Sequence, residues 1–349
     1  MIDAYLVYCR PGFEKEAVAE LNADALRAGW QGHTRANADS GFALFCGHDL
    51  PASGAEAPVW RDLVFARQMV FLPSASPLRL PPEDRITPLV NALAGGRYRD
   101  LRLECPDTND GKGLAGLLKA LTPPLKSVLD KRGILRRKAE QDLHLFFADA
   151  ATVYAGFSTP DNASAWPNGI PRLRFPTGAP SRSTLKLEEA FGYFLDETTQ
   201  AEWLREGLTA VDLGAAPGGW TWQLVKRGLQ VTAIDNGPMD KQLMATGQVE
   251  HLRVDGFRYR PARKVNWLVC DMIESPLKVA GTIAAWIADG DAQRAIFNLK
   301  LPMKKRFEEL QLCRNLITKT LEKAGLAYEL AFKQLYHDRE EVTGYLARR

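Results

Sequence analysis

Apolar runs and helical patterns alternate along the second half of the chain. Short apolar runs predict strands at residues 208–213, 230–235, 249–254, 265–270 and 294–299. Apolar residues at helical spacing predict helices at 184–197, 220–227, 278–288 and 304–324. Two closing strands are predicted at 327–334 and 342–348. This alternation favours an α/β fold with a mostly parallel sheet, helices on both faces and an antiparallel hairpin at one edge.

The first half has shorter elements in no regular order. Strands are predicted at 3–9, 41–46, 63–71, 100–105, 143–148 and 151–157, and helices at 13–29, 84–93, 113–121 and 124–131. Residues 158–182 are rich in Pro, Gly and Ser, which is typical of a linker or a binding loop. We therefore expect an α+β domain at 1–157, a linker at 158–182 and an α/β domain at 183–349.

A glycine-rich corner, V-D-L-G-A-A-P-G-G-W, follows the first strand of the α/β half at residues 211–220. A strand, a glycine-rich turn and a helix form the usual binding site of nucleotide-like ligands in doubly wound sheets. The spacing is not G-x-G-x-x-G and no G-K-[ST] follows, so phosphate binding is not favoured. Asp212 and the Pro217–Gly219 corner suit a zwitterionic ligand that carries an amine, a carboxylate and an adenosine. That ligand is S-adenosylmethionine.

Charged residues follow the other predicted strands, at the edge of the sheet where ligands of open α/β folds bind. Asp235 lies about 20 residues after Gly214, where an acid can accept hydrogen bonds from ribose hydroxyls. Asp255 would face the adenine, and Asp271 and Lys300 end the next two strands. The alternatives are that Asp235 and Asp255 only cap helices or form turns, and that Lys300 belongs to a plain basic patch. Ser183, which precedes a predicted helix, could likewise be only an N-cap.

Composition sets broad limits on the protein. The chain has 349 residues, of which 46% are hydrophobic and 25% are charged, as expected for two globular domains. The five cysteines are scattered without metal-ligand spacing, which indicates reduced thiols in a cytoplasmic protein and no bound metal. No apolar segment approaches the roughly 18 residues of a membrane span, and the N-terminus does not resemble a signal peptide. No obligate protein partner is evident.

Nucleic-acid binding has to be argued from clusters of charge, because the net charge is only +3. The basic clusters are Lys131, Arg132, Arg136, Arg137 and Lys138; Arg172, Arg174 and Arg182; and Lys304, Lys305 and Arg306. Such clusters neutralise phosphates and provide affinity rather than sequence choice. Each one taken alone is more typical of a solvated helix face. Trp166 and Phe175 in the linker could stack on bases or pack between the domains.

The motifs in the second half resemble a known family when they are taken together. They are S-R-S-T-L-K, D-L-G-A-A-P-G-G-W-T, V-x-C-D-M, N-L-K-L-P-M-K-K-R and Q-L-Y-H-D-R-E-E-V-T. The order and strand placement of Lys186, Asp271, Lys300 and Glu341 resemble the K-D-K-E tetrad of the RrmJ/FtsJ-like ribose 2′-O-methyltransferases. The first half, with L-V-F-A-R-Q-M and P-D-T-N-D-G-K, is similar to the ferredoxin-like plus THUMP module of the branch that acts on 23S rRNA.

The resemblance implies a Rossmann-like class I methyltransferase domain that uses S-adenosylmethionine. The substrate it implies is 23S rRNA or its precursor, at the 2′-hydroxyl of a cytidine in the peptidyl-transferase region. Lys300 would accept the proton, Asp271 would orient Lys300, and Lys186 and Glu341 would position the ribose. Glu341 is chosen over its neighbour Glu340 because Val342 follows it. The expected cofactor-binding residues are Ser183, Ala216, Pro217, Gly218, Gly219, Asp235, Asp255 and Asp271.

Four other functions are alternatives to this one. Methyltransferases that act on base amines usually carry [DNS]-P-P-[FY] where this chain has D-M-I-E, which disfavours amine chemistry. A nicotinamide dehydrogenase is disfavoured because G-x-G-x-x-G is missing. A non-catalytic RNA-binding assembly factor, or a 2′-O-methyltransferase of another RNA, stays open.

Overall fold

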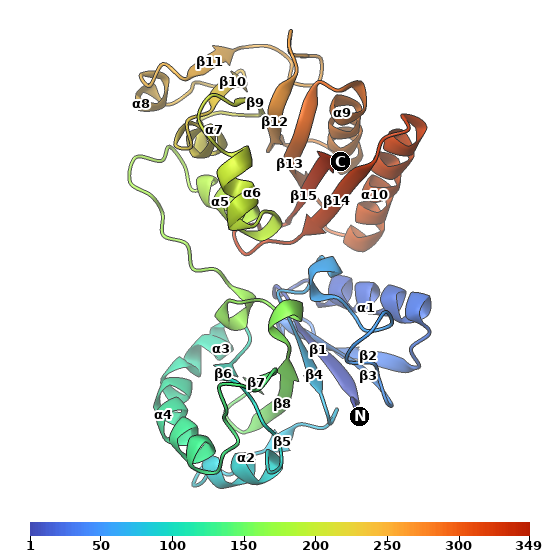
Figure 1. Cartoon of the computed structure of the whole chain (residues 1–349), viewed down its shortest axis with the longest axis vertical. Helices are drawn as coiled ribbons and strands as arrows, with labels where there is room; N and C mark the ends of the chain where they lie inside the picture. The colour runs from blue at the N-terminus through green and yellow to red at the C-terminus, as the bar shows by residue number, and fades with distance from the viewer. The chain divides into compact units, whose positions relative to one another are not determined.

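The computed structural model describes all residues of the chain, 1–349, and divides into two compact units (Figure 1). The first unit is Met1–Pro171 and the second is Arg172–Arg349. The division falls inside the segment expected to be a linker. None of the helices has both the length and the apolar character that crossing a membrane requires.

The first unit is built on an eight-stranded sheet in the order β2-β3-β1-β4-β8-β7-β6, with β5 paired to β8. Its strands are β1 (Ala4–Tyr8), β2 (Gly32–Ala36), β3 (Phe42–Gly47), β4 (Gln68–Leu72), β5 (Leu78–Arg79), β6 (Leu101–Glu104), β7 (Asp142–Phe147) and β8 (Thr152–Ser158). Its helices are α1 (Glu14–Ala28), α2 (Ile86–Ala92), α3 (Asn109–Gly113) and α4 (Ala115–Lys131). Only the β6–β7 pair is parallel. This mixed architecture agrees with the predicted α+β class.

Helix α4 corrects one expectation about this unit. The pair Pro123-Pro124 predicts a break between two helical pieces, but the structure has one helix that contains both prolines. Leu121, Leu125 and Leu129 form a buried stripe at helical spacing that continues across the prolines. Packing of this stripe outweighs the backbone hydrogen bonds that the prolines remove.

The second unit is a seven-stranded sheet in the order β11-β10-β9-β12-β13-β15-β14. Its strands are β9 (Thr209–Leu213), β10 (Gln230–Ile234), β11 (Val249–Leu252), β12 (Val265–Cys270), β13 (Ala292–Lys300), β14 (Tyr328–Lys333) and β15 (Glu341–Arg348). Its helices are α5 (Thr184–Phe194), α6 (Glu197–Trp203), α7 (Gly219–Val225), α8 (Lys241–Met244), α9 (Pro276–Asp289) and α10 (Arg306–Lys323). Strands β9 to β13 are parallel, and β15 runs antiparallel to both β13 and β14. The predicted α/β sheet with an antiparallel edge is confirmed.

The helix expected at 184–197 ends three residues earlier, and a further helix, which was not predicted, follows it. α5 ends at Phe194, and Asp196 takes an extended backbone conformation. The Asp196 carboxylate then accepts a hydrogen bond from the backbone N–H of Thr199, at 2.7 Å. An aspartate N-cap therefore starts α6 as a separate helix.

The strand order places the site of the second unit. From β9 the chain moves to β10 and β11 on one side of the sheet and then to β12 and β13 on the other. Ligands of open α/β sheets bind where the strand order reverses, outside the carboxyl ends of the strands. The antiparallel return of β15 adds one more element here, because it places Glu341 opposite Lys300 in the register of β13 and β15.

Candidate active site

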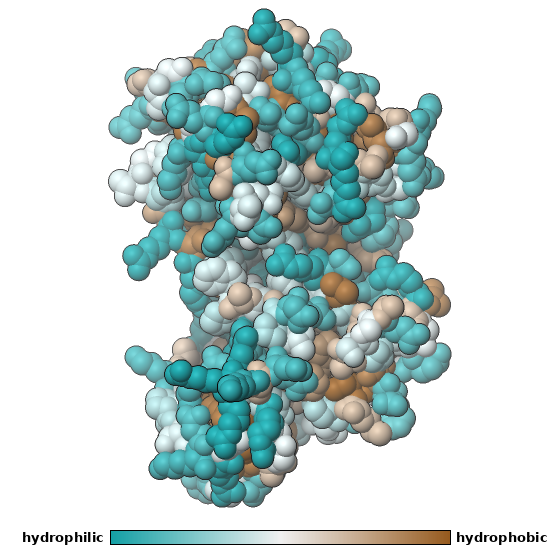
Figure 2. All heavy atoms as spheres, in the orientation of Figure 1, coloured by the Kyte–Doolittle hydropathy of each residue, from teal (hydrophilic) through white to brown (hydrophobic).

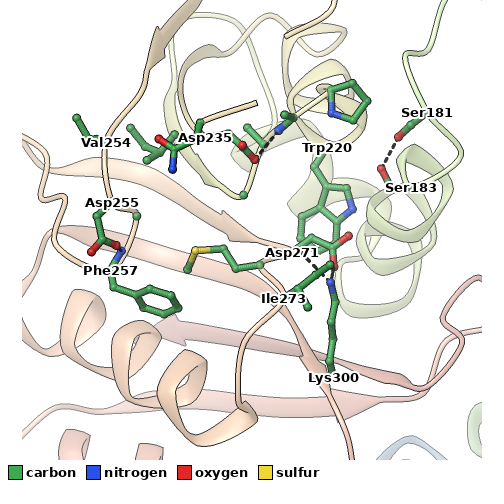
Figure 3. A pocket seen from close by; sticks show the side chains of 18 residues that line it. Ser181, Ser183, Trp220, Asp235, Val254, Asp255, Phe257, Asp271, Ile273 and Lys300 are labelled. Atoms are coloured by element: carbon green, nitrogen blue, oxygen red, sulfur yellow. Dashed lines mark hydrogen bonds and ion pairs between the residues drawn. The ribbon is translucent and has the colours of Figure 1, made fainter. Parts of the chain in front are cut away.

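A cavity of about 790 Å³ opens at the carboxyl ends of β9, β10, β12 and β13 (Figure 3). This volume lies within the roughly 300–1,000 Å³ that is usual for small-molecule sites. The lining residues are Ser181, Ser183, Gly214, Ala215, Ala216, Pro217, Trp220, Ile234, Asp235, Asn236, Val254, Asp255, Gly256, Phe257, Asp271, Met272, Ile273 and Lys300. Six residues of the predicted cofactor set are among them: Ser183, Ala216, Pro217, Asp235, Asp255 and Asp271.

The glycine corner forms the wall between β9 and α7. Gly214 and Gly218 have φ angles of 79° and 116°, which favour glycine. A Cβ on Gly218 would collide with Leu243, and one on Gly219 would collide with Ser183. A side chain at Gly218 would strain the backbone, and one at Gly219 would displace the Ser181 and Ser183 hydroxyls, so both glycines have a structural role within the protein. Neither lines the cavity, and their contact with a ligand stays a prediction.

Asp235, at the end of β10, fixes the corner to the sheet. Its Oδ2 accepts a hydrogen bond from the Ala216 N–H at 3.0 Å, and its Oδ1 accepts one from the Gly237 N–H at 2.7 Å. Each carboxylate oxygen can accept more than one hydrogen bond, so both can still face a ligand hydroxyl. Asp255 lines the cavity and also stabilises a turn, because its Oδ1 accepts a hydrogen bond from the Phe257 N–H at 2.9 Å.

The opposite side of the cavity is more enclosed. In the view of Figure 3, Val254, Asp255 and Phe257 lie on one side, and Ser181, Ser183, Trp220 and Lys300 lie on the other. The Ser183 hydroxyl lies 2.6 Å from that of Ser181 and does not cap α5. The indole Nε1 of Trp220 is buried without a hydrogen-bond partner. The sequence did not predict that Ser181 and Trp220 line the cavity, although they lie in the motifs S-R-S-T-L-K and D-L-G-A-A-P-G-G-W-T.

Beside this side of the cavity, four charged residues from four segments form one cluster. Lys186 Nζ lies 2.9 Å from Glu341 Oε1 and 3.7 Å from Asp271 Oδ2. Lys300 Nζ lies 3.6 Å from Asp271 Oδ1 and donates a hydrogen bond to the Asp271 main-chain oxygen at 3.2 Å. The Asp271 carboxylate thus stands between two ammonium groups. The structure brings together all four residues of the expected tetrad.

The two lysines of this cluster have different surroundings. Burial disfavours the charged form of Lys186, but the Asp271 and Glu341 carboxylates outweigh it and raise the Lys186 pKa. Burial opposes ionisation of Glu341 as well, yet its ion pair and hydrogen bond with Lys186 lower the Glu341 pKa. Lys186 and Glu341 therefore form a fixed ion pair at neutral pH. Of the two lysines, only Lys300 lines the cavity.

Glu340 lies outside the cluster. Its side chain is 58% exposed and forms an ion pair with Arg306 at 2.6 Å. Glu341 is the first residue of β15 and contacts Lys186, whereas Glu340 precedes the strand. The structure assigns the tetrad position to Glu341.

The predicted basic residues lie mainly at the surface. Those of the first cluster follow or end α4 in the first unit, and all five are exposed: Lys131, Arg132, Arg136, Arg137 and Lys138. Figure 2 shows hydrophilic side chains gathered on the face of the first unit that carries β6 and β7 in Figure 1. Arg172, Arg174, Arg182, Lys304 and Lys305 are exposed in the second unit. Arg306 is largely buried in its pair with Glu340.

The aromatic residues of the connecting segment are partly exposed. Trp166 in the first unit is 52% exposed, and Phe175 in the second unit is 45% exposed. Both rings therefore present apolar surface to solvent, as stacking on a base would require.

Comparison with known proteins identifies the family. Three family models match the chain: "RlmM ferredoxin-like domain" at residues 2–70, "Ribosomal RNA large subunit methyltransferase M, N-terminal" at 84–159 and "FtsJ-like methyltransferase" at 179–324. A ribosomal RNA large subunit methyltransferase M from Methylococcus capsulatus is 49% identical, over 98% of this chain and 97% of its own length. The chain belongs to the ribosomal RNA large subunit methyltransferase M family. A relative of the same name from Aromatoleum aromaticum is 51% identical, over 99% of this chain and 95% of its own length.

Family membership confirms part of the sequence-based reading. The FtsJ-like resemblance and the ferredoxin-like fold at the N-terminus are both shown, and the chain is a member of a methyltransferase family, not of a dehydrogenase family. The THUMP assignment of the first unit stays a prediction, as do the individual roles of the site residues.

Proposed function

We propose that this protein transfers a methyl group from S-adenosylmethionine to the 2′-hydroxyl of a ribose in 23S rRNA or its precursor, in the cytoplasm. The observation that carries the reaction class is the arrangement of Lys300, Asp271, Lys186 and Glu341 beside the cavity. The RNA follows from the names of the relatives, and the cytidine of the peptidyl-transferase region follows from the family resemblance.

The cavity suits S-adenosylmethionine in its size and its polar groups. Asp235 and Asp255 offer carboxylate oxygens to the adenosine, on the side away from Lys300. The buried Trp220 Nε1 and the Ser181 and Ser183 hydroxyls offer hydrogen bonds to the amino-acid part. When bound, S-adenosylmethionine supplies a methyl group on a positively charged sulfonium, and the Asp271 carboxylate is placed to attract that charge.

Lys300 is the proposed proton acceptor. A ribose hydroxyl is a poor nucleophile, so its proton must leave to Lys300 Nζ as the oxygen–carbon bond forms and the carbon–sulfur bond breaks. The neutral amine of Lys300 is the form that accepts this proton. Lys186 stays charged in its pair with Glu341 and holds the Asp271 carboxylate from its other side. The cluster then contributes mainly by holding the two reactants in line.

The test is methyl transfer in vitro from labelled S-adenosylmethionine to 23S rRNA, offered free and as a ribosomal precursor, with the product mapped by mass spectrometry. We expect label on one ribose 2′-oxygen with the wild-type protein. Lys300→Ala should lower the rate about 10²- to 10⁴-fold, the range of a lost general base. Lys319→Ala, whose side chain is exposed on α10 outside the basic clusters, is the matched control and should keep most of the rate. Label on a base, or a fully active Lys300→Ala protein, would contradict the proposal.

A further inference from the structure

Behind the charged cluster, a chain of buried polar side chains joins β13, β15 and the turn between β14 and β15. Asn298 and Thr343 are register partners on β13 and β15, and both are fully buried. Because side chains two residues apart on a strand share a face, Asn298 lies on the face of Lys300, and Thr343 lies on the face of Glu341. Asp338, in the turn, is also buried. None of these three residues belongs to the tetrad.

The contacts in this chain lead directly to Asp271. Asn298 Nδ2 donates to Asp271 Oδ1 at 3.1 Å. Asn298 Oδ1 lies 2.8 Å from Thr343 Oγ1, and Thr343 Oγ1 lies 2.9 Å from Asp338 Oδ2. The same Asp338 oxygen accepts the Leu335 N–H at 2.9 Å. Each link has the length of a normal hydrogen bond.

Counting hydrogens decides the direction of the chain. The Thr343 hydroxyl has one hydrogen and two oxygen neighbours, Asn298 Oδ1 and Asp338 Oδ2. If that hydrogen pointed to Asp338, Asn298 Oδ1 would lack a donor. Rotating the Asn298 amide to correct this would place its oxygen against the Asp271 carboxylate oxygen. The Thr343 hydroxyl therefore donates its hydrogen to Asn298 Oδ1. The hydrogen between Thr343 Oγ1 and Asp338 Oδ2 must then be carried by Asp338 Oδ2.

We propose that Asp338 is a neutral carboxylic acid that positions the Asp271 carboxylate through Thr343 and Asn298. Asp338 donates to Thr343, Thr343 donates to Asn298, and the Asn298 amide donates to Asp271 Oδ1. That oxygen is the one that faces Lys300, at 3.6 Å, while Oδ2 faces Lys186. The chain thus fixes the rotation of the carboxylate that lies between the two lysines. Asp338, Thr343 and Asn298 are positioning residues, because none of them lines the cavity.

The charges around Asp338 agree with a neutral acid. Burial raises the pKa of Asp338 well above its ordinary value, and the negative charges of Glu189 and Glu341 raise it further. The hydrogen bond from the Leu335 N–H and the positive charge of Lys186 act in the opposite direction. Glu189 on α5 is itself held by the Tyr336 and His337 N–H groups at 2.8 Å and 2.9 Å and by His337 Nδ1. The turn that carries Asp338 is therefore packed against a second carboxylate, which disfavours another negative charge.

The first test measures the proton itself and needs no activity. In the full-length protein labelled with ¹³C-aspartate, the carboxyl signal of Asp338 is assigned by its loss in Asp338→Asn. We expect a chemical shift of the protonated acid that stays constant from pH 5 to pH 8. A shift of the ionised form, or a titration near the ordinary aspartate pKa, would overturn the proposal.

The second test measures what the chain does, and it depends on the proposed methyl transfer. Thr343→Val removes the hydroxyl and keeps the shape, while Thr343→Ser keeps the hydroxyl. We expect Thr343→Val to lower kcat about 10- to 100-fold, as for other small losses of alignment. Its affinity for S-adenosylmethionine should stay within about twofold by calorimetry, since the cavity is untouched. Thr343→Ser should recover most of kcat.

The outcomes separate the two proposals. Equal kcat for Thr343→Val and wild type would overturn the positioning role and leave the methyl transfer standing. If Thr343→Val also lost cofactor binding or its thermal transition, the ¹³C measurement on the wild-type protein would still decide the protonation state. A wild-type protein that methylates no ribose would overturn the function proposed above, but not the neutral state of Asp338.

Discussion

At the scale of single residues, two glutamates that are neighbours in the sequence make different contacts. Glu341 pairs with Lys186 inside the charged cluster, whereas Glu340 pairs with Arg306 near the surface. Both are glutamates in the same motif, so the sequence alone leaves the choice to the neighbouring Val342. The pairing of β15 with β13 makes the choice, because it places Glu341 opposite Lys300.

This difference gives a matched pair of variants. Glu341→Gln removes the charge that helps to hold Lys186, and we expect kcat for methyl transfer to fall at least tenfold, a typical effect of misplaced reacting groups. Glu340→Gln loses only a half-exposed ion pair and should keep kcat within about twofold. Steady-state kinetics of the two proteins on the same RNA provides the measurement. Equal losses in both would show that the cluster does not depend on Glu341.

Asp212 predicts a pH dependence of stability. It is fully buried near the end of β9, and burial raises its pKa to about 7. The charges of Asp271 and Asp235 act in the same direction, and the hydrogen bond that Thr221 donates acts against them. The folded state then holds a proton that the unfolded state releases above about pH 4. The Asp212 contribution to the free energy of unfolding therefore falls as the pH rises from about 4 to 7, by up to about 1.4 kcal/mol per pH unit, and is constant above that.

Urea unfolding at pH 5, 6, 7 and 8 checks this expectation. Asp212→Asn cannot ionise, so its unfolding free energy should depend less on pH than that of the wild-type protein, with the difference concentrated below pH 7. Parallel pH curves for the two proteins would mean that Asp212 is ionised throughout this range.

At the scale of helices and strands, apolar pattern predicts the buried strands of the second unit but misses a polar edge strand of the first. Strands β9, β10, β12 and β13 are largely buried, and each is signalled by its apolar run. Strand β2, Gly32–Ala36, is polar and mostly exposed at the edge of the first sheet, so no pattern indicates it. The strand-end residues of the site could be predicted because they follow from strand order alone. Asn298 and Thr343 could not, because their contact depends on the pairing of β13 with β15.

A buried hydrogen-bond network stabilises the first unit, and its contribution to stability can be measured. Glu104 at the end of β6 accepts hydrogen bonds from Tyr8 at 2.8 Å and from the Asn168 N–H at 2.7 Å, and pairs with His144 at 2.7 Å. His144 Nε2 lies 2.8 Å from Ser158 Oγ. This Glu–His–Ser order resembles a hydrolase triad, but His144 and Ser158 are fully buried. The network joins β1, β6, β7 and β8.

Removing the carboxylate should destabilise this unit. Burial opposes the charge on Glu104, but His144 and the surrounding donors lower its pKa. Glu104→Gln should cost roughly 3–5 kcal/mol, as for one partner removed from a buried pair. Tyr8→Phe, which removes one hydrogen bond, should cost about 1 kcal/mol. Hydrogen exchange of the β6 and β7 amides in the full-length protein measures both. Equal, small effects would show that the Glu104 carboxylate stabilises this unit no more than one neutral hydrogen bond does.

At the scale of the whole molecule, the family models match both units, and the cavity and the exposed basic residues after α4 belong to different units. The FtsJ-like match at 179–324 contains the cavity and three members of the tetrad, and the remaining member, Glu341, lies beyond its end. The matches at 2–70 and 84–159 cover the unit whose exposed basic residues follow α4. Methyl transfer to a large RNA needs a surface that holds phosphates at a distance from the reacting ribose, because phosphate contacts orient a nucleic acid without reading it.

This division predicts that RNA affinity and cofactor affinity can be changed separately. Arg137→Glu with Lys138→Glu reverses two exposed charges after α4. If they contact phosphates, RNA binding should weaken at least tenfold at moderate salt. The slope of log K against log salt should lose about 0.7–0.9 for each contact. Lys319→Glu with Lys323→Glu makes the same charge change on the exposed side of α10, outside the proposed clusters, and controls for net charge. Filter binding at several salt concentrations, with calorimetry of S-adenosylmethionine, measures both affinities. An equal loss of RNA affinity in the two double variants would mean that net charge, and not this surface of the first unit, holds the RNA.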